Sequence, residues 1–581
     1  MHYGFTNQLH FRDSYAQYAA GFQRVIWHIW YADYGYGNYN WPGYYSGWPF
    51  FYNFGSREPS SRTYEEFNAH LGRIQQLLQT GKSRTDVGFI HNNGVQGIRF
   101  GGGTGNSIPA IGWQTAHQGV NYRSTELQSN GYPYDYFSPE FLFDDDVYFD
   151  EEVPTLETAG YKALVLYQDW LDIKAARKIL EYAQKGLKGV IIDGAAVRTT
   201  FADGKDAELA AIMAELKQLP TVRTAAIHSK TDDFNYFDAV ADGYDDDVYE
   251  ALQELDVRPY AEFAEANHQL LTQTRQDEDG NLYLYAYNYR ANDYHQNSHI
   301  ESVQNEDHGT NIQTKIRMDG MFVPYFIDAW SGEATELANY RYENGQTVFP
   351  IDLDYDNIAL YAFEAVESEK LHVVYTDADS VYANADGVTV RVLESGYYAA
   401  ILNNGSTYAN FIQVPATYDI TNWNLTVESW AANEEAGDLV RTEELFGITT
   451  TNRKTSTVKT NINATLPTMT TWDNIPEVGR NVSGLGRYEA AFTWDAASAD
   501  GAYLDLGDSF VESMVVWING TKVGGDISTH PTKVKKTGGG TIDGQPVEGK
   551  DLYSGGVSWT KPVVDISGYL VDGENEIVIE Y

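Results

Sequence analysis

The fold class is indicated most clearly by residues 161–193, YKALVLYQDWLDIKAARKILEYAQKGLKGVIID. Two short apolar runs, YKALVLY and KGVIID, flank an amphipathic segment, IKAARKILEYAQKG, which ends on a glycine. This order predicts two buried strands joined by a helical crossover. A second helix is predicted over 206–219, where Pro220 stops it. Repeated units of this kind from residue 116 to about 260 predict an open doubly wound sheet, flavodoxin-like in outline.

The pattern on either side of this region differs. Towards the N-terminus it predicts a helix over 10–23, a buried strand over 24–30, an amphipathic helix over 63–81 and a strand over 85–90. Alternation of that kind is typical of an α/β sheet or barrel. After about residue 262 the apolar residues alternate with a period of two, which predicts β-sandwich domains. Asn519-Gly520 lies between two apolar runs and predicts a tight hairpin turn.

Composition excludes several classes of function. Acidic residues number 82 and basic residues 40, which gives a formal charge of −42. Such a surface repels nucleic acid and anionic membranes, whereas neutral ligands such as sugars meet no such barrier. No window has the roughly 18 continuous apolar residues of a membrane span. The chain has no cysteine, so disulfides, thiolate metal sites and cysteine catalysis are excluded.

Metal sites are not indicated by spacing. The runs FDDDVYFDEE (143–152) and DGYDDDVYE (242–250) are dense in carboxylates but lack the D-x-D-x-D-G pattern with a distal glutamate. Solvated acidic surface is the preferred interpretation, with calcium kept as an alternative. The histidines show no zinc motif such as H-E-x-x-H. The sequence therefore predicts no cofactor.

Aromatic residues are concentrated in RVIWHIWYADYGYGNYNWPGYYSGW, residues 24–48. Aromatic rings stack on the apolar C–H faces of sugars, while histidine, aspartate and asparagine bond the hydroxyls. The segment follows a predicted strand, at the end where barrels place their sites. The competing interpretation is that Trp27 and Trp30 belong to the core and the loop packs on a neighbouring domain. The predicted substrate-binding residues are His28, Tyr31, Asp33, Trp41 and Trp48.

Eight segments in order resemble the C-terminal half of the α-L-rhamnosidase family of glycoside hydrolases (family 106). The resemblance covers nearly the whole chain. The segments are AAGFQRVIWHIWY, NWPGYYSG, LGRIQQLLQTGKSRTDVGFIH, GYPYDYFSPEFL, YKALVLYQDWLDIKAARKIL, DGNLYLYAYNYR, PYFIDAWSGEATELANY and NVSGLGRYEAAFTW with its continuation AYLDLGDSFVESMVVWINGTKVGG.

The resemblance implies that the chain begins with the last units of a catalytic (β/α)8 barrel and ends in a galactose-binding-like jelly roll. Together with the periodicity, it predicts a multidomain protein that is α/β first and all-β afterwards. The expected domains are the barrel end at 1–90, the doubly wound α/β domain at 91–261, a β-sandwich at 262–368, a β-rich linker domain at 369–435 and the jelly roll at 436–581.

Catalytic residues cannot be carried over from the family. Its two glutamates precede the strand that matches residues 24–30, and this chain has almost nothing before that strand. An inverting glycosidase needs two carboxyl groups about 6.5–9.5 Å apart. The carboxylates available in the first 90 residues are Asp13, Asp33, Glu58, Glu65, Glu66 and Asp86. Asp13, Glu65 and Glu66 are expected on the solvated faces of helices, and Asp33 and Glu58 flank the aromatic loop.

We therefore expect a glycosidase of α-L-rhamnosidase type, acting on polysaccharide or glycoside side chains, that need not be active as this chain alone. Its catalytic glutamates would lie upstream or on a partner segment that completes the barrel. The alternative is a non-catalytic carbohydrate-binding or structural homologue. The partner is a carbohydrate in either case. A secreted or periplasmic location is expected, although the N-terminus shows no signal peptide.

Overall fold

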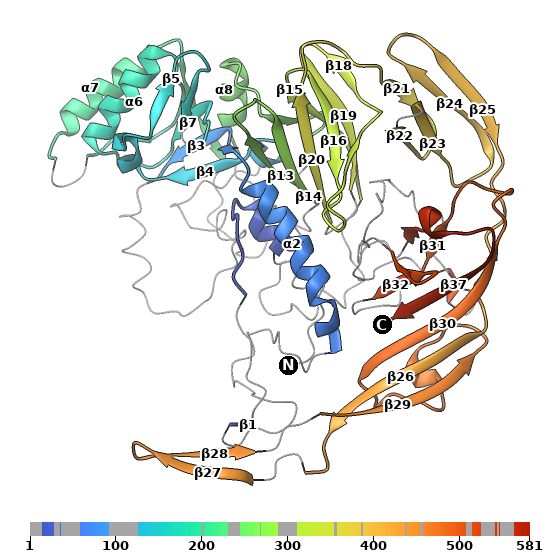
Figure 1. The fold of residues 1–581 in the computed structure, drawn as a ribbon. Helices are drawn as coiled ribbons and strands as arrows, with labels where there is room; N and C mark the ends of the chain where they lie inside the picture. The colour runs from blue at the N-terminus through green and yellow to red at the C-terminus, as the bar shows by residue number, and fades with distance from the viewer. Residues whose placement is uncertain are drawn as a thin grey trace.

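The structure is a computed structural model of the whole chain. It describes residues 14–27, 35–36, 59–91, 126–157, 159–199, 203–229, 245–267, 269–288, 311–353, 357–384, 387–435, 439–453, 457–506, 514–523, 541–542, 545–546 and 563–581. Within these residues strands greatly outnumber helices (Figure 1).

The first large unit is a five-stranded parallel sheet with helices on both faces (Figure 1). Its strands in spatial order are β4 (Tyr134–Phe137), β3 (Val87–Ile90), β7 (Ala163–Leu166), β8 (Lys188–Ile192) and β9 (Val222–Ala225). Helices α6 (Ile173–Lys185) and α7 (Asp206–Leu216) cover one face, and α5 (Glu126–Ser129) and α8 (Val248–Glu254) cover the other.

The local sequence explains helix α6. Asp172 caps its start, because one carboxylate oxygen accepts hydrogen bonds from the backbone N–H groups of Lys174 and Ala175 at 2.8 and 3.1 Å. Gly186 ends it with a φ of 127° that favours glycine. Strands β3 and β7 are buried at every position and are continuous apolar runs without alternation, whereas the outer strands β4 and β9 carry the partly exposed Asp135 and Arg223.

The second unit is a sandwich of two antiparallel sheets around one apolar core. One sheet comprises, in spatial order, β17 (Ala334–Glu336), β16 (Phe322–Ile327), β20 (Ile358–Ala365), β14 (Leu282–Asn288), β13 (Leu270–Gln276) and β2 (Lys82–Arg84). The other comprises β12 (Ala261–Phe263), β15 (Ile312–Asp319), β19 (Gln346–Leu353) and β18 (Arg341–Glu343).

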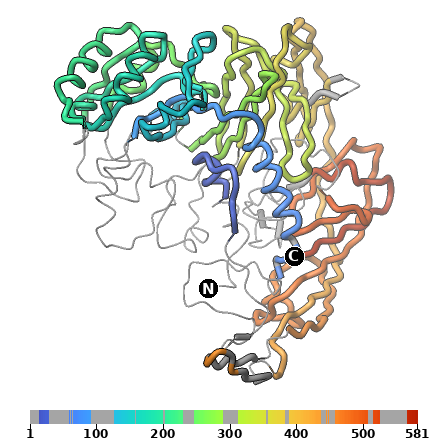
Figure 2. The backbone as a smooth tube through the Cα atoms, turned by 60° about the vertical axis from the view of Figure 1, so that its left-hand side comes forward, coloured from blue at the N-terminus to red at the C-terminus, as the bar shows by residue number. Residues whose placement is uncertain are grey.

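Two N-terminal helices cover the outer face of the six-stranded sheet. They are residues 14–19 and α2 (Tyr64–Leu78), which η1 (Pro59–Thr63) precedes. Tyr15 and Tyr18 pack with α2 against Tyr285 and Tyr287 of β14. Figures 1 and 2 both show α2 running from this sandwich towards the C-terminal sheet.

Two expectations for the N-terminal region were wrong. Residues 24–27 form no strand, and Ile26 is 87% exposed. A strand there would need a neighbour to bond and bury it, and none of the described strands pairs with these residues. β3, which was assigned to the barrel end, lies inside the parallel sheet, and β2 joins the sandwich. The described part of 1–90 therefore contributes its strands to three other sheets, because β1 (Gly35–Tyr36) pairs with β28 (Ile448–Arg453) in a third one.

The linker region forms a small antiparallel sheet and a hairpin. The sheet contains β21 (Val373–Thr376), β24 (Gly396–Leu402) and β25 (Thr407–Ile412), and the hairpin contains β22 (Ser380–Asn384) and β23 (Gly387–Arg391). Val373, Ala400 and Leu402 pack inward with Ala338 of the preceding sandwich.

The C-terminal unit is a six-stranded antiparallel sheet with a core of its own. Its strands in spatial order are β29 (Thr457–Leu466), β26 (Trp423–Ala432), β30 (Gly484–Trp494), β37 (Gly573–Glu580), β32 (Val515–Ile518) and β33 (Thr521–Lys522). The predicted turn at Asn519-Gly520 is confirmed. It joins β32 to β33, and both residues have positive φ, 51° and 75°.

Short elements complete the described chain. They include one small three-stranded sheet and four strand pairs, all antiparallel. The three-stranded sheet contains β1 (Gly35–Tyr36), β28 (Ile448–Arg453) and β27 (Leu439–Leu445). The pairs are β5 (Tyr148–Asp150) with β6 (Thr155–Glu157), β10 (Ile227–Ser229) with β11 (Asp245–Asp246), β31 (Tyr503–Asp505) with β36 (Val563–Asp565), and β34 (Thr541–Ile542) with β35 (Gln545–Pro546). The remaining single turns are η2 (Pro139–Phe143), η4 (Trp472–Asn474) and η5 (Ser567–Tyr569).

Candidate functional site

All the predicted substrate-binding residues lie outside the described part of the chain. They are His28, Tyr31, Asp33, Trp41 and Trp48. The structure describes what precedes them: Trp27 packs beside Phe67 of α2, with ring centroids 5.6 Å apart. Trp27 is therefore partly core, as the competing interpretation supposed, and the sugar-binding role of the loop stays a prediction.

The carboxylates of the first 90 residues divide into two groups. Asp13, Asp33 and Glu58 lie outside the described residues. Of the others, Glu65 is exposed on α2 as expected, but the expectation of a solvated Glu66 was wrong. Glu66 forms an ion pair with Lys522 of β33. The first turn of α2 faces the C-terminal unit, so Glu66 acts as a contact between units.

Asp86 is the carboxylate with the most perturbed surroundings. It precedes β3 and is fully buried, and burial raises its pKa to about 7 against the opposing effect of Lys162. The Lys162 ammonium lies 3.6 Å from one carboxylate oxygen, to which the backbone N–H of Tyr260 also donates at 2.8 Å. Perturbed groups of this kind occur in active sites and in structural ion pairs. The position of Asp86 at the amino edge of the sheet favours the structural role.

A cluster of polar and aromatic side chains lies at the opposite, carboxyl edge of the parallel sheet. β3 is the first strand of this sheet in chain order, with β4 on one side and β7 on the other, so the strand order reverses between β3 and β7. Open α/β sheets bind ligands at that point, beyond the carboxyl ends of the strands. His91 directly follows β3, and Tyr167 and Gln168 directly follow β7.

The three side chains form one hydrogen-bonded group. The Gln168 side-chain amide donates to His91 Nδ1 at 3.2 Å, and the Tyr167 hydroxyl bonds the same nitrogen. Since Nδ1 then accepts, the neutral ring carries its hydrogen on Nε2. Tyr136 packs beside His91 with centroids 5.3 Å apart, and burial raises the pKa of Tyr167, so its hydroxyl keeps its proton.

This group suits binding more than proton abstraction. Nδ1 of His91 is engaged by two side chains, and the ring is buried. The amide and hydroxyl, flanked by ring faces, combine polar and aromatic groups of the kind that recognise sugars. From the sequence, His91 shows no zinc-binding spacing, and its place in this group was not predicted. The available signal was its place directly after a buried apolar strand.

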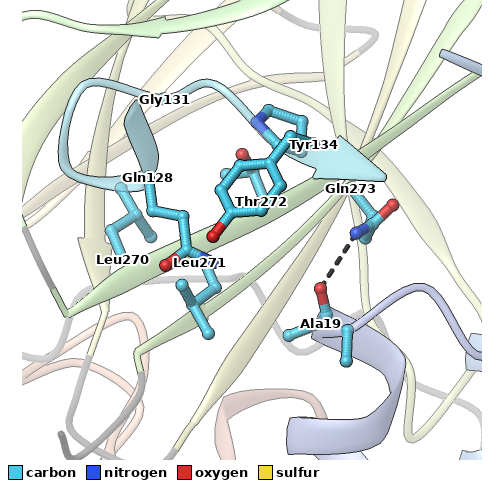
Figure 3. A pocket seen from close by; sticks show the side chains of 10 residues that line it. Ala19, Gln128, Gly131, Tyr134, Leu270, Leu271, Thr272 and Gln273 are labelled. Atoms are coloured by element: carbon cyan, nitrogen blue, oxygen red, sulfur yellow. Dashed lines mark hydrogen bonds between the residues drawn. The ribbon is translucent and has the colours of Figure 1, made fainter. Parts of the chain in front are cut away.

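The cavity in Figure 3 is too small for a sugar. It lies between residues 19–20, the turn before β4 and strand β13, and its volume is about 30 Å³. That volume accommodates one or two waters. The side-chain amide of Gln273 donates across it to the carbonyl of Ala19 at 2.9 Å (Figure 3). The cavity is therefore a packing gap beneath the N-terminal helix.

The acidic runs do not form a metal site in the described residues, where no group of three or more histidine or acidic side chains could hold an ion. Asp150 accepts hydrogen bonds from the backbone N–H groups of Glu152 and Val153, which closes a turn. In the second run, residues 242–244 lie outside the described part, and Asp247 pairs with His228. Among the described helices, none is long and apolar enough to span a membrane.

Comparison with known proteins relates the fold to one class. No family model and no curated protein matches the chain. Over its whole length it is similar to the structure of a rhamnosidase from Novosphingobium sp. PP1Y, with a TM-score of 0.58 and 17% identity, and it covers 42% of that protein. The chain thus has a rhamnosidase-like glycoside hydrolase fold and spans about two fifths of that enzyme's length.

Two further solved structures show weaker likeness. The apo exo-carrageenase GH42 from Bacteroides ovatus has a TM-score of 0.26 and 8% identity, with 52% of this chain and 31% of that one covered. A catalytic mutant of Gan42B, a GH42 beta-galactosidase from G. stearothermophilus, has a TM-score of 0.33 and 12% identity, with 62% of this chain and 51% of that one covered.

Proposed function

We propose that this chain is part of a glycoside hydrolase of α-L-rhamnosidase type, which cleaves polysaccharide or glycoside side chains by an inverting two-carboxylate mechanism. The observation that carries the proposal is the likeness to a rhamnosidase along the whole chain. An inverting enzyme pairs an acid with a base that activates water. In this proposal a segment upstream of residue 1, or a partner chain, supplies both glutamates and most of the barrel.

The aromatic loop is assigned to substrate binding within this proposal. His28, Tyr31, Asp33, Trp41 and Trp48 supply the mixture of rings and hydrogen-bonding groups that sugars require. The parallel-sheet unit corresponds in this proposal to a flavodoxin-like domain, and the C-terminal unit to a galactose-binding-like jelly roll. A secreted or periplasmic location is proposed with it, because polysaccharide substrates lie outside the cell.

The alternative is a non-catalytic carbohydrate-binding or structural homologue. It is favoured because two of the described carboxylates near the N-terminus have structural surroundings: Glu66 is in an ion pair and Asp86 is buried. Both proposals predict sugar binding, and only the first predicts hydrolysis once the barrel is complete.

Turnover separates the two proposals. We expect the chain alone to release no nitrophenol from an aryl α-L-rhamnoside above the uncatalysed rate, because this proposal places the catalytic pair upstream or on a partner chain. The protein encoded by the complete natural reading frame, or this chain mixed with the upstream segment, should hydrolyse the rhamnoside and leave the matched aryl β-galactoside intact. Clear turnover by this chain alone would show that its own carboxylates suffice. An inactive complete protein that still binds the sugar would favour the alternative.

Substitutions in the aromatic loop test the proposed binding residues. Trp41→Ala and Asp33→Ala should each weaken rhamnose binding about tenfold or more in calorimetric titration, because the first removes a stacking surface and the second a charged hydrogen-bond partner. Tyr148→Ala, which changes a half-exposed tyrosine of β5, is the matched control and should leave binding unchanged. Unchanged binding in both loop variants would remove the ligand role of this loop.

A further inference from the structure

The sheet β21-β24-β25 has one face that is packed and one that is open. Inward, Val373, Ala400 and Leu402 belong to an apolar cluster with the preceding sandwich. Outward, the alternate residues of each strand are exposed or partly exposed, and Figure 1 shows the β24–β25 hairpin curving along the outside of the molecule. β25 is the edge strand of the described sheet.

Aromatic rings stand at both ends of the open face. Tyr397 of β24 is in register with Phe411 of β25, and their rings meet edge to face with centroids 5.1 Å apart. Tyr397 is 80% exposed and Phe411 46%. At the other end, Tyr375 of β21 is in register with Ile401 and is 46% exposed. Residues 397 and 401 are about 13 Å apart along an extended strand.

The floor between the rings is low, and one carboxylate, that of Asp377, borders it. Ala399 and Ala409 face each other in the rung after the aromatic pair, and Ile401 and Thr407 form the next rung. Small side chains between large ones leave a shallow trough with aromatic ends. The outward residues within the three strands are uncharged, but the exposed Asp377 directly follows β21, and its carboxylate accepts a hydrogen bond from the backbone N–H of Ala399 at 2.6 Å. The outward residues are Tyr375, Tyr397, Ala399, Ile401, Thr407, Ala409 and Phe411.

The size and chemistry of this face indicate which kind of ligand it can bind. Three strands about 4.8 Å apart and five residues long present an area on the order of 150–200 Å². A stable protein interface buries roughly 800 Å² on each partner, so the face is too small for a second copy. A face whose strands carry no basic side chain offers an anionic polymer no ion pair, and both Asp377 and the acidic protein as a whole repel such a polymer. Sugar rings stack on tyrosine and phenylalanine, while the Thr407 hydroxyl and the tyrosine hydroxyls can bond sugar hydroxyls.

We propose that the outer face of β21-β24-β25 binds a short segment of a neutral polysaccharide. This face would hold the polymer independently of hydrolysis, since its residues lie more than 300 positions from the aromatic loop and in another sheet. It would keep the enzyme, or a non-catalytic homologue, attached to the polymer that carries the side chains.

Affinity gel electrophoresis of the whole chain tests the proposal. Galactomannan, xyloglucan and arabinoxylan serve as neutral probes and polygalacturonate as the anionic one. We expect at least one neutral polymer to retard the protein, and polygalacturonate not to. Tyr397→Ala and Phe411→Ala should each raise the dissociation constant about tenfold. Tyr408→Ala is the matched control, because Tyr408 is also exposed on β25 but is in register with the inward Ala400, and it should change binding less than threefold.

Three results would overturn the proposal. They are retardation by none of the neutral polymers, equal loss in Tyr397→Ala and Tyr408→Ala, or concentration-dependent dimers in sedimentation that Tyr397→Ala abolishes, which would identify a second copy as the occupant. These substitutions are at exposed positions, and unchanged circular dichroism confirms that each variant is folded. Because retention rather than turnover is measured, this proposal and the hydrolytic one can fail separately.

Discussion

Replacing Lys162 with methionine should lower the free energy of unfolding of the parallel-sheet unit by about 3–5 kcal/mol near pH 8, because it leaves a buried carboxylate without its cation. The carboxylate is that of Asp86, which is fully buried where this unit meets the antiparallel sandwich. Lys162 lies 3.6 Å from one of its oxygens and also donates to the carbonyl of Arg258 at 2.7 Å. The other oxygen has no hydrogen-bond partner among the described residues.

The loss of stability in Lys162→Met should depend on pH. Burial raises the pKa of Asp86 from 3.8 to about 7, so the folded protein holds this proton more tightly than the unfolded chain. Between about pH 4 and 7 the wild type therefore loses stability from this group as pH rises. Without Lys162 the pKa of Asp86 rises further. The free energy of unfolding of the variant therefore keeps falling above pH 7, by up to about 1.4 kcal/mol per pH unit.

Other charged groups near the pair are unchanged in the variant. Arg84, Glu157 and Asp319 act on Tyr260 or Lys162 from neighbouring elements, and Tyr132 is buried beside Asp86. Their contribution cancels when wild type and variant are compared at one pH. The pH slope of the difference then contains Asp86 and the removed Lys162, whose own pKa burial lowers, and comparing Lys162→Met with the double variant isolates Asp86.

Urea unfolding followed at 222 nm measures the effect, since α6, α7 and α8 supply much of the helical signal and pack on this sheet. Asp86→Asn combined with Lys162→Met should recover most of the stability and flatten the pH slope, because asparagine is neutral. Lys178→Met, on the solvent side of α6, is the control and should change stability by less than about 0.5 kcal/mol. A pH-independent loss in Lys162→Met, or no recovery in the double variant, would contradict this account.

The elements of the parallel sheet could be predicted from local sequence. A helix was expected over 173–186 and lies at Ile173–Lys185, and the strand expected over 188–193 lies at Lys188–Ile192. The reason is that each signal is local: Asp172 and Gly186 cap the helix, and buried strands in a parallel sheet are unbroken apolar runs.

The placement of residues 24–27 could not be predicted in the same way. RVIW has the composition of a buried strand, yet Val25 and Trp27 are only partly buried where they pack against the cluster that contains α2, and Ile26 is exposed. Whether an apolar run becomes a strand depends on a partner strand, and that is a property of the tertiary structure.

The candidate site at the sheet edge also depends on long-range order. His91 and Gln168 are 77 residues apart, and they meet because β7 pairs with β3. No spacing motif encodes that pairing. The ion pair of Glu66 with Lys522 joins residues that are even further apart in the sequence. The local sequence of α2 does not reveal this partner, so a solvated Glu66 was expected.

Replacing Gly81 with alanine should release helix α2 from the sandwich. Gly81 links α2 to β2 with a φ of +58°, and a Cβ there would lie 2.1 Å from the backbone carbonyl oxygen of Gln276. Neither backbone can move freely, because Lys82 pairs with Gln276 and the buried Arg275 donates to the carbonyls of Thr80 and Gly81 at 2.9 and 2.6 Å. Removing the clash must break these charge-assisted hydrogen bonds, and the expected cost is about 4 kcal/mol.

Amide exchange read by mass spectrometry should detect this loss directly. A cost of about 4 kcal/mol corresponds to exchange roughly a thousandfold faster in peptides of α2, while peptides of α6 stay unchanged. Gly280→Ala is the matched control. Gly280 also has positive φ, +87°, but an added Cβ meets nothing within 4 Å, so only conformational strain of about 1–2 kcal/mol should appear, confined to the β13–β14 turn. Equal effects in the two variants would show that α2 is held by its apolar face alone, because the contact of Gly81 with Gln276 and Arg275 would then add nothing beyond the strain that both glycines share.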